Sequence, residues 1–182
     1  MSTTLINTLT ASQDKTITGT YQNNGNGHSG TYTDTVTHES NGTIDVSLSA
    51  TRDDGHTYSA DTVYTVVSAT QVSSQTQITN FDGQQVSVSR SFSLNADGSI
   101  ALTANWTRPT GTETVTGTIT HANGVSTETA TFIDSSGATG SFTLTDSHSN
   151  GSFDWNDQIQ IVGVNGQTHD HSVDITGTYQ VS

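Results

Sequence analysis

Apolar and polar residues alternate along most of this chain, and the polar positions are usually threonine or serine. In residues 86–94, valine, arginine, phenylalanine and leucine occupy every second position, with serines between them. A period of two is the pattern of a β-strand with one packed face and one hydrated face. The same pattern is clear in residues 17–21, 32–38, 44–52, 100–106, 115–121 and 173–181. The chain is therefore predicted to be all-β.

Short turn signals separate these segments. Asn-Gly or Asp-Gly occurs at 41–42, 54–55, 82–83, 97–98, 123–124, 150–151 and 165–166. Such pairs favour tight hairpin turns, because asparagine, aspartate and glycine tolerate positive φ. The spacing of the turns predicts an antiparallel up-and-down meander of about 10–12 strands.

The two ends of the chain carry matching segments. Residues 16–22 read Thr-Ile-Thr-Gly-Thr-Tyr-Gln, and residues 174–180 repeat this from the second position onward. First and last strands of similar sequence would suit a sheet that closes on itself and so removes its exposed edges. We expect one barrel domain over 15–182 after a flexible segment at 1–14, with a β-sandwich as the alternative.

Composition narrows the classes of function. The formal charge is −13, so binding of nucleic acid is not expected. There is no cysteine to form a disulfide, and no apolar run long enough for a transmembrane helix. A lipid-facing β-barrel is disfavoured by the low aromatic content of 7%. Low lysine content and abundant threonine, serine, asparagine and glycine are associated with exported or cell-surface proteins. The N-terminal residues lack a signal-peptide pattern, so export would need a leaderless route or a mature fragment.

Arg90 is the most informative single position, because it falls on an apolar strand face where a permanent positive charge needs a partner. One interpretation is an internal salt bridge to Asp34 or Asp146. The other is a ligand-binding group in an apolar cavity. The second interpretation predicts a site whose members are Arg90, Asp34, Tyr32, Tyr64, Phe92, Trp106, Phe142, His38 and His121.

Residues 146–157 resemble the calcium loop of an EF-hand at several positions. The candidate oxygen ligands are Asp146, Asn150, Asp154 and Asp157. The loop departs from the pattern because His148 stands where an oxygen ligand belongs and no helices are predicted around it. The competing interpretation is an ordinary hairpin turn at Asn150 and Gly151. Asp53 with Asp54, and Asn95 with Asp97, form weaker oxygen clusters.

His169 and His171 form a His-x-His pair that could hold zinc if a third ligand reached it. The chain has seven histidines, most of them near turns. With alternating strand directions, His38, His121 and His148 would gather at one rim of the barrel. A rim of this kind, or an Asp146–His148 pair, could support acid–base or metal-assisted chemistry.

Together these patterns favour a non-enzymatic, exported or cell-surface barrel that holds a small, partly apolar molecule or a glycan. One alternative is a calcium-stabilised structural or adhesive module. The other is an enzyme that uses a cluster of histidine and aspartate at one rim. Calcium is the possible cofactor, and zinc is the less favoured one.

Overall fold

The computed structural model describes residues 13–182, and this part of the chain forms twelve antiparallel strands and no helix. The strands follow one another around a closed barrel in sequence order, with β12 hydrogen-bonded to β1. They are β1 (Lys15–Asn23), β2 (Ser29–His38), β3 (Thr43–Arg52), β4 (Thr57–Ser68), β5 (Gln71–Thr79), β6 (Gln85–Leu94), β7 (Ile100–Arg108), β8 (Gly111–Ala122), β9 (Val125–Asp134), β10 (Thr139–Ser149), β11 (Ser152–Val162) and β12 (Thr168–Val181). The predicted all-β meander is confirmed.

The two matching end segments close the barrel. In the β1–β12 ladder, Gly19 lies opposite Tyr179 and Tyr21 lies opposite Gly177. Just past the end of β12, the carbonyl oxygen of Ser182 accepts from the backbone N–H of Thr16 on β1 at 3.0 Å, and the N–H of Ser182 donates back to the carbonyl oxygen of Thr16 at 2.9 Å. Closure of the sheet is thus confirmed, and the β-sandwich alternative is wrong.

The predicted turn residues adopt the expected backbone conformation. The glycine of each of the seven Asn-Gly and Asp-Gly pairs given above has positive φ. At 123–124 and 150–151 the asparagine is also in the left-handed region, with φ of 53° at Asn123 and 50° at Asn150. Two consecutive residues of positive φ make the primed turn that matches the twist of a two-residue hairpin.

Strand alternation separates an inner face from an outer one. The buried residues Val72, Val88 and Leu102 mark the inner alternation on three successive strands. The register continues that alternation around the barrel. It places all the large rings expected inside on the inner face, namely Tyr21, Tyr32, Tyr58, Tyr64, Phe92, Trp106, Phe142 and Tyr179. The outer face carries most of the threonine and serine.

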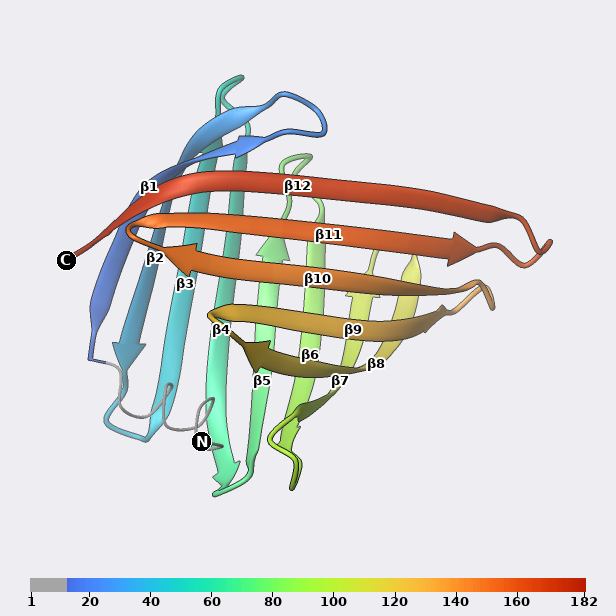
Figure 1. Ribbon diagram of the computed structural model, residues 1–182, viewed down its shortest axis with the longest axis horizontal. Coiled ribbons are helices and arrows are strands. Elements are labelled where there is room, and N and C mark those ends of the chain that lie inside the picture. Colours follow the sequence, from blue (N-terminus) through green and yellow to red (C-terminus); the bar gives the residue numbers. More distant parts are fainter. Residues whose placement is uncertain (1–12) are drawn as a thin grey trace.

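The barrel is filled on one side and open on the other. In Figure 1, strands β9–β12 run across strands β2–β7 rather than alongside them, so the two halves of the wall face each other as layers. A core fills the side formed by β6–β9, with Val86, Val88, Leu102, Ala104, Val115 and Ala130 as its buried members. Twelve strands enclose more space than these side chains fill. The remaining space lies between β1–β4 and β10–β12.

Most of the predicted flexible segment lies outside the described residues, which begin at residue 13. Asp14 is held against the barrel: its carboxylate accepts a hydrogen bond from the backbone N–H of His38 at 2.7 Å. Within residues 13–182, no helix has the length and apolar character needed to cross a membrane.

Candidate functional site

The open side of the barrel contains a pocket of about 470 Å³ lined mainly by aromatic rings. The rings are Tyr21, Tyr32, Tyr58, Phe81, Phe153 and Trp155, contributed by β1, β2, β4, β11 and the loop between β5 and β6. His148, Leu48, Ala50 and Ile175 complete the lining. The volume falls within the range of small-molecule sites, which are concave and mostly apolar.

Glycines opposite the rings keep this pocket open. On β1 and β2, Tyr21 lies opposite Gly30 and Tyr32 lies opposite Gly19. A Cβ atom at either glycine would lie 2.7 Å from Cε1 of the facing tyrosine, well inside van der Waals contact. Each ring therefore lies flat over a glycine of the neighbouring strand, an arrangement that shields the glycine and keeps the ring against the wall. Phe153 covers Gly177 in the same way.

The rings also contact one another across strands that are distant in sequence. Tyr32 and Phe153 meet edge to face with centroids 5.8 Å apart, and Tyr58 and Phe81 lie 5.6 Å apart. Edge-to-face and tilted pairs at these separations are favourable because ring edges and faces carry opposite partial charge. The contacts hold the lining in place.

Two carboxylates lie one strand alternation deeper than the rings. Asp34 follows Tyr32 on the inner face of β2, and Asp157 follows Trp155 on the inner face of β11. Burial raises the pKa of Asp34, an effect partly offset by Lys15, and burial also raises the pKa of Asp157. Oδ1 of each carboxylate is buried and has no hydrogen-bond partner among residues 13–182.

Arg90 does not form the internal salt bridge that was one of its two predicted roles. Among the described residues, no carboxylate lies within 4.0 Å of its guanidinium. Its Nη1 donates to Oγ1 of Thr76 at 2.9 Å, and its Cζ lies 5.4 Å from the centroid of Trp106. The carboxyl group that feels its charge is Glu128, whose pKa is raised by burial and lowered in part by Arg90. A hydroxyl and an aromatic face thus stabilise this cation in place of a carboxylate.

The other predicted ligand-binding residues are spread through the barrel. Of that set, only Tyr32 lines the ring-lined pocket. Tyr64 is half-buried beside Ser74 and Arg90 in the β4–β6 ladders, and burial raises its pKa. Phe92, Trp106 and Phe142 pack against the core. Phe142 also borders, with His171, a second cavity of about 500 Å³ that is lined largely by serine, threonine and glutamine.

Two of the three predicted rim histidines, His38 and His121, lie apart from the pocket. Nδ1 of His38 is 3.0 Å from a carboxylate oxygen of Asp14, and Nδ1 of His121 is 3.1 Å from Oγ of Ser126. His148 lines the pocket instead, with Nε2 3.1 Å from a carboxylate oxygen of Asp146. The three histidines therefore do not converge on one rim cluster.

Residues 146–157 do not form a calcium loop. They are the end of β10 and the start of β11, joined at Asn150 and Gly151, so the competing hairpin interpretation is confirmed. Hairpin pairing places Asp146 opposite Trp155 on the inner face. Asp154 is exposed on the other face of β11, while Asp157 lies deeper inside. An extended strand cannot bring these side chains around one ion, whereas a calcium loop curls to do so.

The hairpin geometry makes a prediction about calcium. Addition of 5 mM calcium, or of a chelator, is expected to leave the melting temperature within about 1 °C, because a ligand stabilises a protein only by binding its folded state. Differential scanning calorimetry measures this. A rise of several degrees that disappeared in an Asp146→Asn, Asp157→Asn variant would show that these carboxylates do share an ion.

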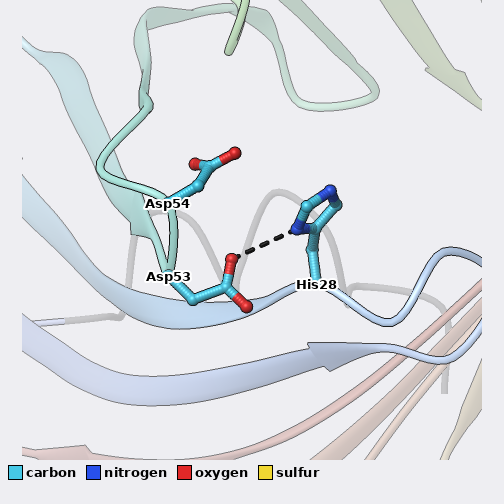
Figure 2. A group of neighbouring side chains, drawn as sticks. All are labelled: His28, Asp53 and Asp54. Carbon is cyan, nitrogen blue, oxygen red and sulfur yellow. Dashed lines mark hydrogen bonds and ion pairs between the residues drawn. The ribbon is translucent and has the colours of Figure 1, made fainter.

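His169 and His171 lie on the same face near the start of β12, opposite Ile161 and Ile159, and both are exposed. Among residues 13–182, the group of histidine and acidic residues close enough to share a metal ion is His28, Asp53 and Asp54 (Figure 2). The predicted pair therefore has no third ligand at metal-binding distance within the described chain.

The group in Figure 2 is explained by hydrogen bonds within the protein. Nδ1 of His28 is 3.1 Å from Oδ1 of Asp53, whose other oxygen accepts from Ser29. Asp54 is paired with the guanidinium of Arg52, whose Nε donates to it at 2.9 Å, and this holds the pKa of Asp54 well below its ordinary value. A cation at this position would compete with Arg52. These contacts fasten the β1–β2 and β3–β4 loops to each other.

Sequence reasoning left nine of the ten residues that line the pocket out of its binding site, and it did not single out Glu128 in the interior. Phe153 and Trp155 alternate with polar residues as a strand requires, but this signal was assigned to a calcium loop. Glu128 lies among threonines on β9, where its inward direction depends on register. Phe81 belongs to a turn, and no periodicity could have predicted that its ring lines the pocket.

Comparisons of the chain with protein-family models, with curated proteins and with solved structures found no match.

Proposed function

We propose that this barrel is a non-enzymatic binding protein for a small molecule with an apolar or aromatic body. The observation that carries the proposal is the ring-lined pocket of about 470 Å³ on the open side of the barrel. Solvated cavities of this size and lining are unfavourable unless a ligand removes their apolar surface from water. The polar outer face and low lysine content suit a protein that works outside the cell.

The pocket is largely preformed. Its walls are strands held by continuous ladders, and its rings rest on glycines or on each other. Binding would therefore require little ordering of side chains, which is a main cost of association. A molecule of roughly two fused rings would fit this volume. In a typical small-molecule site, about 70–90% of the ligand's surface is buried.

A fluorescence titration tests this function. We expect 2-naphthylmethanol, a neutral two-ring probe, to bind with a Kd in the micromolar-to-millimolar range, as expected for a ligand of about a dozen heavy atoms. Binding should change the emission of Trp155, which lines the pocket, and leave that of Trp106 unchanged, because Trp106 lies in the core between Arg90 and Arg108.

Two single-tryptophan variants form the matched control. The change should persist in Trp106→Phe and disappear in Trp155→Phe. A signal that followed Trp106, or saturable binding unaffected by enlarging Ala50 to phenylalanine, would place the probe elsewhere and contradict the proposed site. Ala50 is a suitable position because its small side chain lines the pocket.

A further inference from the structure

Two carboxylates border the aromatic pocket without lining it. Asp34 is the inner-face neighbour of Tyr32 on β2 and lies opposite Leu48, and Asp157 is the inner-face neighbour of Trp155 on β11. Oδ1 of each is buried and has no hydrogen-bond partner among residues 13–182. The hydroxyl of Tyr21, in the wall, is also buried without a partner. An ionised carboxylate can only accept hydrogen bonds. A ligand that satisfies these oxygens must therefore bring donors.

The aromatic walls favour the same kind of ligand. The face of an aromatic ring carries partial negative charge, so a cation placed over it is attracted, most strongly where water is excluded. Tyr32 and Trp155, which line the pocket, are the inner-face neighbours of the two carboxylates. A positively charged group that donates hydrogen bonds would therefore be stabilised both by the aromatic rings and by the carboxylates.

The charges around the pocket do not favour an anion. The chain carries 17 acidic and 4 basic residues, so its field attracts cations. Arg52, whose guanidinium lies over the Phe81 ring of the pocket, is paired with Asp54, and Arg90 donates to Thr76 and lies against Trp106. Lys15 acts on Asp34 only through its charge and provides no hydrogen bond to the orphaned oxygen.

We propose that the pocket recognises small organic cations: an aromatic or apolar body between the rings, with a primary ammonium group directed toward one of the two carboxylates that border the rings, Asp34 or Asp157. This inference rests on the proposed function, because it names the class of ligand that the same pocket takes. A primary ammonium supplies three donors and a positive charge, so it can satisfy the unpartnered oxygen of either carboxylate.

Three probes that share one ring system and differ in charge test the inference. They are 2-naphthylmethylamine, 2-naphthylmethanol and 2-naphthoate, each titrated at pH 7.5 by isothermal calorimetry. We expect the amine to bind at least about tenfold more tightly than the alcohol, since cation–ring attraction and charge-assisted hydrogen bonds are both lost in the neutral probe. The carboxylate should bind most weakly of the three.

A pair of matched variants locates the effect. Asp34→Asn with Asp157→Asn removes both inner charges, whereas Asp61→Asn with Asp170→Asn removes two outer ones. Both variants have a formal charge of −13 + 2 = −11. The inner variant should lose the tenfold preference for the amine and keep its affinity for the alcohol. The outer variant should retain the preference.

Each contrary result has a distinct meaning. Equal binding of amine and alcohol, tightest binding of the carboxylate, or equal loss in both variants would overturn the cation inference while leaving a small-molecule pocket. Failure of all three probes to bind the wild-type protein would instead contradict the proposed function itself.

Discussion

Replacing Gly177 by alanine is expected to destabilise the barrel by about 1–3 kcal/mol, the usual range for overpacking a filled site. A Cβ at this position would lie 2.5 Å from Cζ of Phe153 and would collide with the carbonyl oxygen of Thr20 on β1. The ring can turn aside into the pocket, but the backbone of the closing β1–β12 ladder has little freedom to move. The midpoint of urea denaturation measures the loss.

The same variant should also weaken binding of the naphthyl probes, because a displaced Phe153 ring would occupy the space that the probe needs. Gln180→Ala, at an exposed position on the same strand, is the control and should change stability by no more than about 0.5 kcal/mol. If Gly177→Ala unfolded at the wild-type urea concentration and bound probe normally, the ring would not depend on glycine for its position.

The second large effect concerns pH. Burial raises the pKa values of Asp34 and Asp157 in the folded barrel, whereas in the unfolded chain they return to ordinary values near 3.8. Between the unfolded and the folded pKa values, the folded protein binds more protons, so its free energy of unfolding falls as pH rises through that window. Above that window both carboxylates are ionised in the folded barrel, where burial disfavours their charge. Lowering the pH toward 5 should stabilise the ligand-free barrel.

Other titrating groups determine the pH range over which this stabilisation is observed. Asp34 faces Lys15, Tyr32 and Tyr64, while Asp157 faces Glu128 and His171. Glu128 also has a raised pKa and adds to the same trend. Hydrogen bonds lower the pKa values of several surface carboxyls, namely Asp14, Asp53, Asp54, Asp97 and Asp134. Their stabilisation is lost as pH falls below about 4, so maximum stability is expected at mildly acidic pH.

The inner double variant separates this effect from general charge repulsion. At pH 7, Asp34→Asn with Asp157→Asn should be more stable than wild type by about 1 kcal/mol, after allowance for solvent screening of half-buried groups. When the pH is lowered from 7 to 5, its free energy of unfolding should rise less than that of the wild-type protein. The outer variant, Asp61→Asn with Asp170→Asn, should keep the wild-type dependence of the free energy of unfolding on pH. If the free energy of unfolding depended on pH identically in all three proteins, burial would not be raising the pKa values of the inner carboxylates.

Stability and binding are thus expected to change in opposite directions in one variant. Loss of Asp34 and Asp157 should strengthen the empty barrel and weaken its hold on a cation. Residues that serve only folding would not show this trade-off. It is expected of carboxylates whose hydrogen bonds are completed only when a ligand binds.

Much of this architecture could be predicted from the sequence because it follows from local patterns. Period-two alternation gave each strand an inner and an outer face, and the tight turns at residues such as Asn150 and Gly151 set the register of each hairpin. The matching end segments predicted closure. These signals act between neighbours in a meander, where every strand pairs with the next one along the chain.

The site depended on contacts that local patterns do not encode. Tyr32 and Phe153 are far apart in sequence and meet only because the barrel closes and β9–β12 fold across the other strands. Arg90 was recognised as inward, but its partners, Thr76 and Trp106, depend on how far its side chain reaches. Alternation decides which face a residue occupies. Only closure and crossing of the strands decide what it faces across the interior.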